Sequence, residues 1–500
     1  MKQITLIAIL LMLAAILAAG CTSPQMTYPA SQGDTLYTQA ESEFLNNNLH
    51  AAEKLYVEAY NQYKAEGNAA GEKKAFNKAS VAGRITYEFI FNESEIVSAI
   101  DEAFPDVPAE RKAGWLPCDQ SQCIESDGTV WYYTDTIHNI RFHNPDLMRQ
   151  WTAALGETPL YDQLKYLTFA PADEGAGNYV NPVTWEGTEV LIIPIDLLPK
   201  TGTLRLWFPL PVETESQRDV TIISVAPAEY IKEQSGMGAD LGLAYFEIPL
   251  EGVTGDFLNL TTQFRYTQYE QRFTIDPAKV GRYNTSDPEY KKYTRSSRNI
   301  ALTPEMKAKA QEIVGNETNP YLQAEKIYWH VIEMPYSHIS HSRLDAAGIP
   351  ESVYVLNTGF GDCGTQSIYF AALCRSLGIP ARAIGGFQMI SGNAGAHFWA
   401  EYYIPGYGWI PNDVTVAEMA EYSFDATDDE RHQFKAYYAS SLDPYRYIIQ
   451  KDVDLPLVPD PGDVVFYRTV VQYPKVVCDT CNFDPEFVLL EDWKVTVKKV

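Results

Sequence analysis

Residues 359–382 read GFGDCGTQSIYFAALCRSLGIPAR, a pattern that predicts a cysteine at the start of an apolar helix. Gly378 ends the helical pattern, and Pro380 follows at the distance typical of a helix terminus. A thiol in the first turn lies at the positive end of the helix dipole, beside backbone N–H groups that lack a partner within the helix. Both features favour a reactive thiolate, so Cys363 is the candidate nucleophile.

Two downstream residues complete the parts of an activated-thiol site, because the nucleophile needs a base and the base needs an orienting group. His397 opens an aromatic run with strand character, and Asp413 follows a Pro-Gly-Tyr-Gly turn at 405–408. Side chains alternate along strands, so the two share a face only if the connecting loop is odd, with Ile404 opposite Gly408. We therefore predict an odd loop, or a β-bulge at one of the glycines, so that Asp413 contacts one imidazole nitrogen and the thiol lies near the other.

The arrangement predicts a thiolate–imidazolium pair whose thiol pKa lies well below the free value of about 8.5. The backbone N–H groups of Cys363 and Gly364 are predicted to face the developing oxyanion. Taken singly, a helix cysteine, a strand histidine and a turn aspartate are usually structural residues, but their order and elements together favour a site. Four other histidines lack this context and are interpreted as surface or structural residues: His330, His338, His341 and His432.

The motifs around these residues resemble the transglutaminase-like superfamily over about 320–420. They are Gly-Asp-Cys-Gly at 361–364, Leu-Gly-Ile-Pro-Ala-Arg at 377–382, His397 with Phe398-Trp399, Pro-Gly-Tyr-Gly-Trp at 405–409, and Asp413. The resemblance implies a papain-like core, in which a nucleophile helix packs on an antiparallel sheet that carries the histidine and aspartate. The family frequently has Asp-Pro-Thr where this chain has Asp413-Val414-Thr415. A side-chain oxyanion donor, which relatives have, is not identifiable; Tyr336 is the candidate.

The resemblance also implies acyl chemistry at a carboxamide through a thioester. Hydrolysis of a peptide, isopeptide or carboxamide bond in a protein or peptide is the expected function, since water as acceptor needs no second binding pocket. Nothing resembles the calcium sites of animal cross-linking enzymes, and no cofactor or metal is expected. One alternative is a transglutaminase that passes the acyl group to an amine. Another is a non-enzymatic binding or scaffold lipoprotein that uses its N-terminal helices.

The N-terminus predicts export. An uncharged apolar run at 4–19 has the length of a signal peptide, and Leu-Ala-Ala-Gly-Cys ending at Cys21 resembles the lipobox of exported lipoproteins. We expect a signal peptide at 1–20, lipidation of Cys21 and a tether at 21–34, which places the protein outside the cytoplasm on a membrane. An uncleaved N-terminal anchor is the alternative. The net charge of −26 argues against a nucleic-acid partner.

The other cysteines fit an oxidising compartment. Cys374 is interpreted as a small core residue of the nucleophile helix. Two close pairs are disulfide candidates: Cys118 with Cys123, and Cys478 with Cys481. A zinc site built from both pairs is the alternative, although no histidine stands beside either at ligand spacing.

Together these patterns predict an α+β multidomain chain. Helical spacing broken at Asn46-Asn47-Asn48 resembles one tetratricopeptide hairpin and suggests a peptide-binding groove, with an ordinary helical bundle as the alternative. Short β-rich runs separated by turns predict an antiparallel sandwich. The expected parts are a helical and mixed region at 35–180, the β domain at 186–275, the catalytic domain at 276–440 and a β-rich extension at 441–500.

Overall fold

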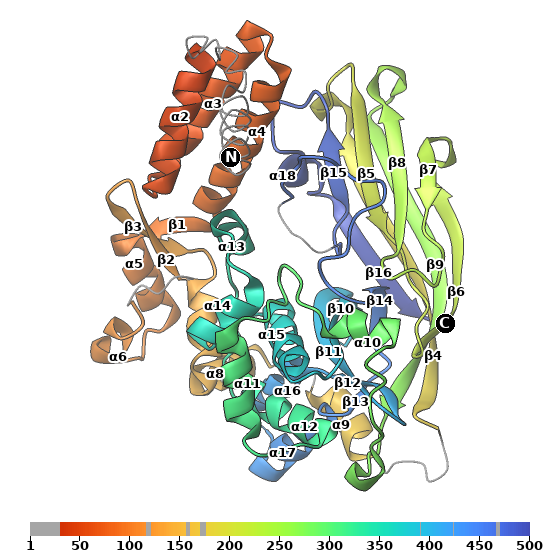
Figure 1. The fold of residues 1–500 in the computed structure, drawn as a ribbon. Coiled ribbons are helices and arrows are strands. Elements are labelled where there is room, and N and C mark those ends of the chain that lie inside the picture. Colours follow the sequence, from red (N-terminus) through yellow and green to blue (C-terminus); the bar gives the residue numbers. More distant parts are fainter. Residues whose placement is uncertain are drawn as a thin grey trace, which may run out of the picture. The chain divides into compact units, whose positions relative to one another are not determined.

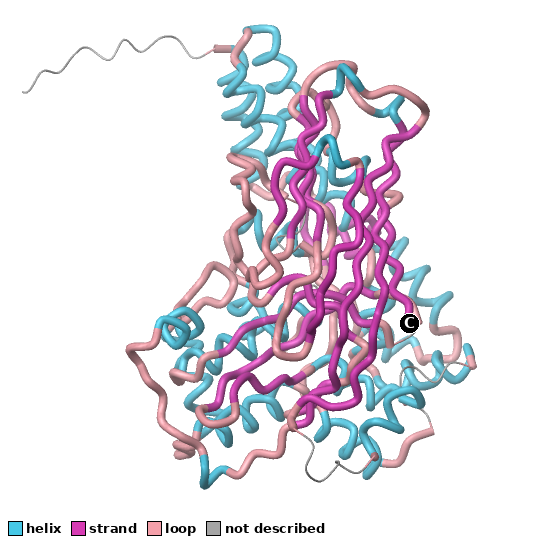
Figure 2. Tube along the Cα trace, turned by 90° about the vertical axis from the view of Figure 1, so that its right-hand side faces the viewer, coloured by secondary structure: helices cyan, strands magenta, loops and turns pink. Residues whose placement is uncertain are grey.

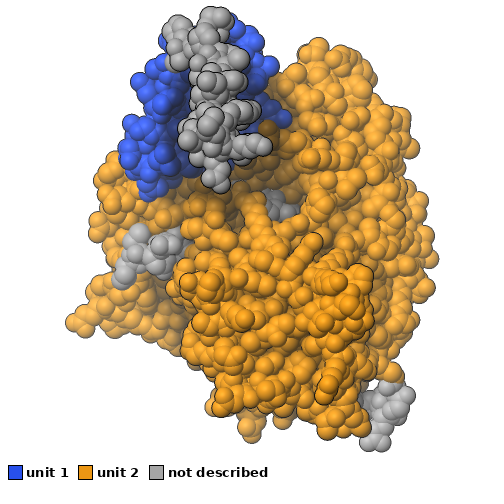
Figure 3. Space-filling model, viewed as in Figure 1, with its two compact units in different colours: residues 1–82 blue, residues 83–500 orange. Residues whose placement is uncertain are grey.

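The protein is described from a computed structural model, which covers residues 31–116, 122–156, 161–170, 177–390, 392–423, 425–466 and 471–500. The chain divides into two compact units, residues 1–82 and 83–500 (Figure 3). Helices together with several antiparallel sheets confirm the α+β class predicted from the sequence (Figure 1).

The first unit is helical, with α2 (Gln32–Leu45), α3 (Leu49–Glu66) and the start of α4 (Ala69–Glu88). Asn47 adopts a left-handed backbone, with φ of 62°, at the predicted break between the first two helices. Alanine and tyrosine side chains form a small core: Tyr37, Ala40, Ala52, Tyr56, Ala59, Tyr63, Ala75 and Ala82. The predicted likeness to a tetratricopeptide unit is not confirmed.

The second unit begins with a three-stranded sheet, of order β1-β3-β2, and its surrounding helices. Their bounds are β1 (Phe89–Asn92), α5 (Glu93–Ala103), α6 (Ala109–Ala113), β2 (Cys123–Ser126), β3 (Thr129–Tyr133), α7 (Thr136–Phe142), α8 (Pro145–Leu155) and α9 (Tyr161–Phe169). This region holds a loop of the catalytic domain: the Tyr133 hydroxyl donates to the carbonyl of Ile339, and the Asn139 amide donates to that of His338, both at 2.9 Å.

The β-rich runs predicted at 186–275 lie in two antiparallel sheets that share an apolar core. One sheet has the order β13-β9-β4-β16, with β6 also on β9, and the other has the order β15-β5-β8-β7. Figure 2 shows the long strands running side by side. The bounds are β4 (Tyr179–Pro194), β5 (Thr203–Pro209), β6 (Gln217–Ala226), β7 (Ile231–Gln234), β8 (Leu243–Pro249), β9 (Phe257–Arg272), β13 (Ser441–Leu442), β15 (Lys475–Cys478), α18 (Pro485–Leu489) and β16 (Trp493–Lys499).

The catalytic domain is a sheet of order β12-β11-β10-β14 with helices packed on it. The strands are β10 (Ala381–Gln388), β11 (Gly395–Ile404), β12 (Gly408–Asn412) and β14 (Arg446–Gln450). The helices are α10 (Pro288–Thr294), α11 (Pro304–Val314), α12 (Pro320–Val331), α13 (His341–Ala347), α14 (Glu351–Thr358), α15 (Cys363–Ser376), α16 (Val414–Glu418) and α17 (Asp428–Tyr437). Helix α15 contacts β10, β11, α11, α12 and α14, which explains why nearly all of its residues are buried.

Strand β14 joins the catalytic sheet to the sandwich, because its side chains alternate between the two sides. Ile448 belongs to the core that contains α15, whereas Tyr447 and Ile449 pack with aromatic residues of the sandwich strand β9. The Tyr447 hydroxyl reaches Glu189 of β4, to which it donates a hydrogen bond of 2.9 Å. Glu189 is fully buried, and this burial raises its pKa to about 8.

Replacing Glu189 by glutamine should remove a pH dependence of stability. The folded chain keeps the Glu189 proton up to about pH 8, whereas the unfolded chain releases it near 4.5, so stability falls as pH rises between these values. We expect Glu189→Gln to raise the free energy of unfolding at pH 8 by roughly 2–4 kcal/mol and to leave it unchanged at pH 4. Urea unfolding at several pH values measures this.

Glu186→Gln on the same strand is the matched control, because the Glu186 side chain is part-exposed and paired with Arg265. Parallel stability profiles for wild type and Glu189→Gln would contradict the assignment of this pH dependence to Glu189.

Candidate active site

The start of α15 is fixed by a capping box that places Cys363 as the first helical residue. Asp362 Oδ1 accepts from the N–H of Thr365, whose hydroxyl accepts from the N–H of Asp362, both at 2.9 Å. A side chain at Gly361 would place its Cβ 2.3 Å from Thr365 Oγ1, so the box requires glycine there. Since Asp362 takes the N–H of Thr365, the capping box does not use the two predicted oxyanion donors, the N–H groups of Cys363 and Gly364; in this structure the Gly364 N–H points at the Cys363 sulfur.

The strand pair that carries His397 and Asp413 has the predicted register. Ile404 faces Gly408, so the loop between β11 and β12 is odd. His397 Nε2 lies 2.8 Å from Asp413 Oδ2, and both side chains are buried. Gln472 holds the strand beside the histidine, because its Nε2 donates to the carbonyls of His397 and Gly386 at 2.7 Å each.

Asp413 is held ionised by a buried arginine that the sequence did not indicate. Arg446 Nη1 donates to Asp413 Oδ2 at 2.6 Å, and Arg446 Nη2 donates to Asp443 Oδ2 at 2.6 Å. Burial alone would raise the pKa of Asp413, but His397, Arg446 and the N–H of Val416 outweigh it and hold the pKa at about 2. The available signal was a charged residue at the start of an apolar β run, at 446–449.

The expectation of a depressed thiol pKa was wrong for the resting site. Burial, and then the neighbouring Asp362 carboxylate, raise the pKa of the Cys363 thiol above its ordinary value. The N–H groups of Phe398 and Gly364 that point at the sulfur offset only part of this effect. These surroundings therefore oppose a free thiolate at Cys363, so its proton is expected to leave as the sulfur attacks.

Cys363 lies in a pocket of about 360 Å³. Ala396 and Phe398, the chain neighbours of His397, line the same pocket. Tyr336, the candidate side-chain donor, also lines it, and its backbone forms a parallel bridge with Gly361. The remaining wall contains residues from several distant segments, among them Tyr133, Asp135, His338, His341, Gln472 and Tyr473.

His341 and His338, which were interpreted from the sequence as surface or structural residues, both line this pocket. His341 lies between two carboxylates, with Nδ1 2.9 Å from Glu351 Oε1 and Nε2 2.7 Å from Asp362 Oδ2. No spacing motif connects these three residues, so the sequence carried no signal for their contact. His330 and His432 lie outside the pocket, and His432 stacks on Trp329 with ring centres 5.2 Å apart.

Some of the remaining predicted residues lie within the described segments, and others do not. Cys478 and Cys481 form a disulfide, which removes this pair from the zinc alternative. Cys123 is also disulfide-bonded, whereas Cys118 and the lipidation candidate Cys21 lie outside the described residues. Cys374 is a buried free thiol. The described segments contain no cluster of side chains that could hold a metal ion. They also contain no helix with the length and apolar character needed to span a bilayer.

Replacing Asp413 by asparagine should slow the reaction of Cys363 with iodoacetamide at pH 7 by about 100-fold or more. The amide would no longer orient His397 as a base or balance the charge that His397 gains when it takes the thiol proton. The rate is measured by mass spectrometry of the peptide that contains Cys363.

The matched control is Asp443→Asn. The Asp443 carboxylate contacts Arg446 as Asp413 does, but its other hydrogen bonds are with Tyr438 and Tyr445 and not with His397. Both variants should lower the melting temperature because each leaves Arg446 with one carboxylate. If both variants slow alkylation equally, Asp413 acts only through stability.

Comparison with known proteins agrees with this geometry. The family described as the Transglutaminase-like superfamily matches residues 307–414. An uncharacterized protein of Haemophilus influenzae is 28% identical over 319 residues, which is 57% of this chain and 84% of that protein.

Two solved structures are similar at low identity. A proposed cysteine protease from Cytophaga hutchinsonii has a TM-score of 0.40 and 16% identity over 64% of this chain and 91% of that one. The periplasmic domain of TgpA from Pseudomonas aeruginosa has a TM-score of 0.24 and 17% identity, over 47% of this chain and 96% of that one. Structural similarity at this level does not indicate a shared activity. Cys363, His397 and Asp413 all fall within the family match, and the chain therefore contains a domain of the transglutaminase-like superfamily at residues 307–414.

Proposed function

We propose that this protein is a thiol enzyme that hydrolyses a peptide, isopeptide or carboxamide bond in a protein or peptide through a Cys363 thioester. The observation that carries the proposal is the 2.8 Å contact between His397 and Asp413, beside the pocket that Cys363 lines. Because Nε2 of His397 contacts Asp413, Nδ1 is the nitrogen that would accept the proton of the thiol. A nucleophile, a base and an orienting carboxylate are thereby assigned to three residues.

In the acylation step, the Cys363 sulfur attacks the carbonyl carbon while its proton passes to His397. The charge that develops on the carbonyl oxygen is stabilised by the N–H groups of Cys363 and Gly364. The C–N bond then breaks, and His397 returns the proton to the leaving nitrogen, which departs as ammonia or an amine. The product on the enzyme is a thioester.

In the deacylation step, water gives a proton to His397 and attacks the thioester carbon. The C–S bond breaks, the sulfur recovers the proton, and a carboxylic acid leaves.

Transfer of the acyl group to an amine is the second candidate function, and one feature of the structure favours it. A second hollow, of about 260 Å³, shares Tyr473 with the catalytic pocket and could hold an acceptor.

The proposal includes a place outside the cytoplasm, on a membrane. The apolar N-terminal run with Cys21 supports this, and so does the Cys478–Cys481 disulfide, since disulfides persist mainly in oxidising compartments. Substrates would then be exported or envelope proteins and peptides.

The test is turnover of defined peptides by purified wild-type protein and Cys363→Ala. The peptides contain glutamine and asparagine side chains, backbone bonds and branched isopeptide links, with and without a biotinylated primary amine. We expect the wild type to release ammonia or a new amine and to show an acyl adduct on Cys363 by intact mass, and Cys363→Ala to show neither.

The reaction products identify the acyl acceptor, water or an amine. Free acid as the main product supports hydrolysis, whereas incorporation of the biotinylated amine supports cross-linking. Equal turnover by Cys363→Ala would contradict the proposed nucleophile. A folded wild type that forms neither product nor acyl adduct on any of these bonds would favour the scaffold alternative. The matched control is Cys374→Ala, which alters a buried cysteine of the same helix and should retain activity.

A further inference from the structure

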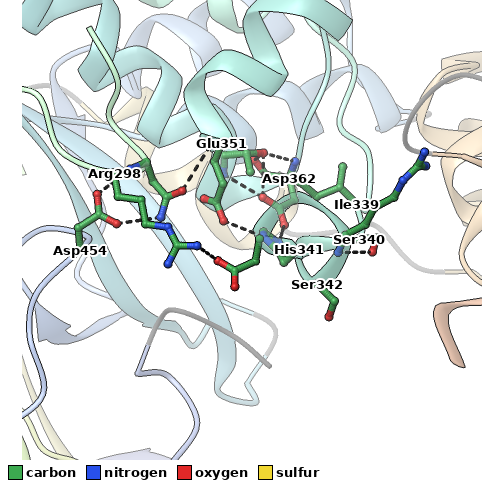
Figure 4. A network of polar contacts seen from close by, with 12 residues as sticks. Arg298, Ile339, Ser340, His341, Ser342, Glu351, Asp362 and Asp454 are labelled. Carbon is green, nitrogen blue, oxygen red and sulfur yellow. Dashed lines mark hydrogen bonds and ion pairs between the residues drawn. The ribbon is translucent and has the colours of Figure 1, made fainter. Parts of the chain in front are cut away.

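His341 is held between two carboxylates that come from different elements of the fold. Glu351 lies at the start of α14 and Asp362 immediately precedes α15. Figure 4 shows the imidazole between them, with the contacts of 2.9 and 2.7 Å described above. A neutral imidazole has one N–H donor, so both contacts are satisfied only when each ring nitrogen has a proton. Burial would lower the pKa of His341, but Asp362 and Glu351 outweigh it and raise the pKa well above its ordinary value.

The position of each partner is fixed independently of His341. Glu351 is held through Asn299, whose side-chain oxygen accepts from the Glu351 N–H at 3.4 Å and whose amide donates to Asp454 at 2.8 Å. Asp362 is held by the capping box of α15. The start of α13 is fixed by Ser340, which accepts from the N–H of Arg343 at 3.1 Å. The imidazole therefore lies between the Asp362 carboxylate, which the capping box anchors, and the Glu351 carboxylate, whose backbone is held by Asn299.

Asp362 is the chain neighbour of the nucleophile, and its two oxygens have different partners. Oδ1 accepts from Thr365 in the capping box, whereas Oδ2 faces His341. A carboxylate beside a thiol opposes formation of the thiolate and of an oxyanion at the same helix start. The charge that His341 faces is thus the one that most directly opposes the proposed chemistry.

We propose that His341 is a positioning residue for the nucleophile: as an imidazolium, it neutralises the Asp362 carboxylate beside Cys363 while leaving that carboxylate free to cap α15. The proposal rests on Cys363 being the nucleophile. It explains how a helix that begins with an aspartate cap can also begin with a cysteine that must give up its proton. The capping box needs the carboxylate or its amide equivalent, and the thiol needs that charge to be balanced.

Other titratable groups face the same pocket and are held constant in the test. The charged or ionisable ones are Glu88 from α4, Asp135 after β3, His338 before α13, and Glu351, Asp362 and Cys363. Three phenols also line the pocket: Tyr133, Tyr336 and Tyr473. Of these groups, Glu351 and Asp362 have contacts with the imidazole nitrogens.

The experiment is a charge cycle with His341→Gln, Asp362→Asn and the double variant. Asparagine caps helices about as well as aspartate, so Asp362→Asn removes the charge and keeps the cap. The rate of Cys363 alkylation by iodoacetamide, a neutral reagent, is measured from pH 6 to 10 by mass spectrometry of the labelled peptide. Thermal unfolding of each variant is measured in parallel.

If the proposal is correct, His341→Gln alkylates about tenfold more slowly at each pH below the midpoint, which corresponds to a displacement of about one pKa unit. Asp362→Asn accelerates alkylation by no more than about threefold, because His341 balances most, though not all, of the carboxylate charge that raises the thiol pKa. The double variant also stays near wild type, since there is no longer a carboxylate to balance.

Two results would overturn the proposal. One is an unchanged rate profile for His341→Gln. The other is a tenfold or greater acceleration by Asp362→Asn alone, which would show that Asp362 is unbalanced in the wild type. This second result remains decisive if His341→Gln fails to fold. A purely structural role predicts a lower melting temperature for His341→Gln without a displaced profile. Failure of the proposed function is separately visible, because Cys363 alkylation then shows no dependence on His397 in a His397→Ala variant.

Discussion

The catalytic arrangement depends on a buried ionic chain that runs from His397 through Asp413 and Arg446 to Asp443. Arg446 and both aspartates are fully buried, with 0% exposed side chains. Loss of any one of these residues leaves a buried charge without its partner. This lowers the stability of the fold far more than loss of a surface ion pair does. The carboxylate that orients His397 is therefore available only when β14 is in place beside β10.

This requirement links the site to the rest of the second unit. Arg446 lies on one side of β14 with the catalytic residues, while Tyr447 lies on the other side and bonds Glu189 of the sandwich. Because side chains alternate along a strand, adjacent residues of β14 can contact the catalytic residues on one side and the sandwich on the other. The close approach of β14 to β10 explains Gly386, where an added Cβ would lie 1.9 Å from the carbonyl oxygen of Tyr447. The sandwich supports the sheet that carries the base.

The pocket holds a thiol whose ionisation is opposed by burial, and the strand beside it carries a histidine whose orientation is fixed by Asp413. Enclosure raises the cost of a free thiolate, so the proton of Cys363 is best moved to His397 when the carbonyl carbon is already within reach. His341 and Asp362 add a balanced charge pair at the same helix start.

Local chemistry in the sequence was sufficient for the elements and for the three central residues. The Gly-Asp-Cys-Gly start of α15, the odd loop between Ile404 and Gly408, and the break at Asn47 follow from capping, alternation and turn preferences within a few residues. Those rules act along the chain. The contacts of Arg446 with Asp413 and of His341 with Asp362 could not be assigned in this way, because these partners are 33 and 21 residues away and no periodicity relates them. The resting state of Cys363 was also decided by tertiary structure, since burial and the charges around a thiol depend on what the whole unit packs against it. Sequence alone determined which residues could react; the folded pocket decided their protonation, their orientation and the residues that support them.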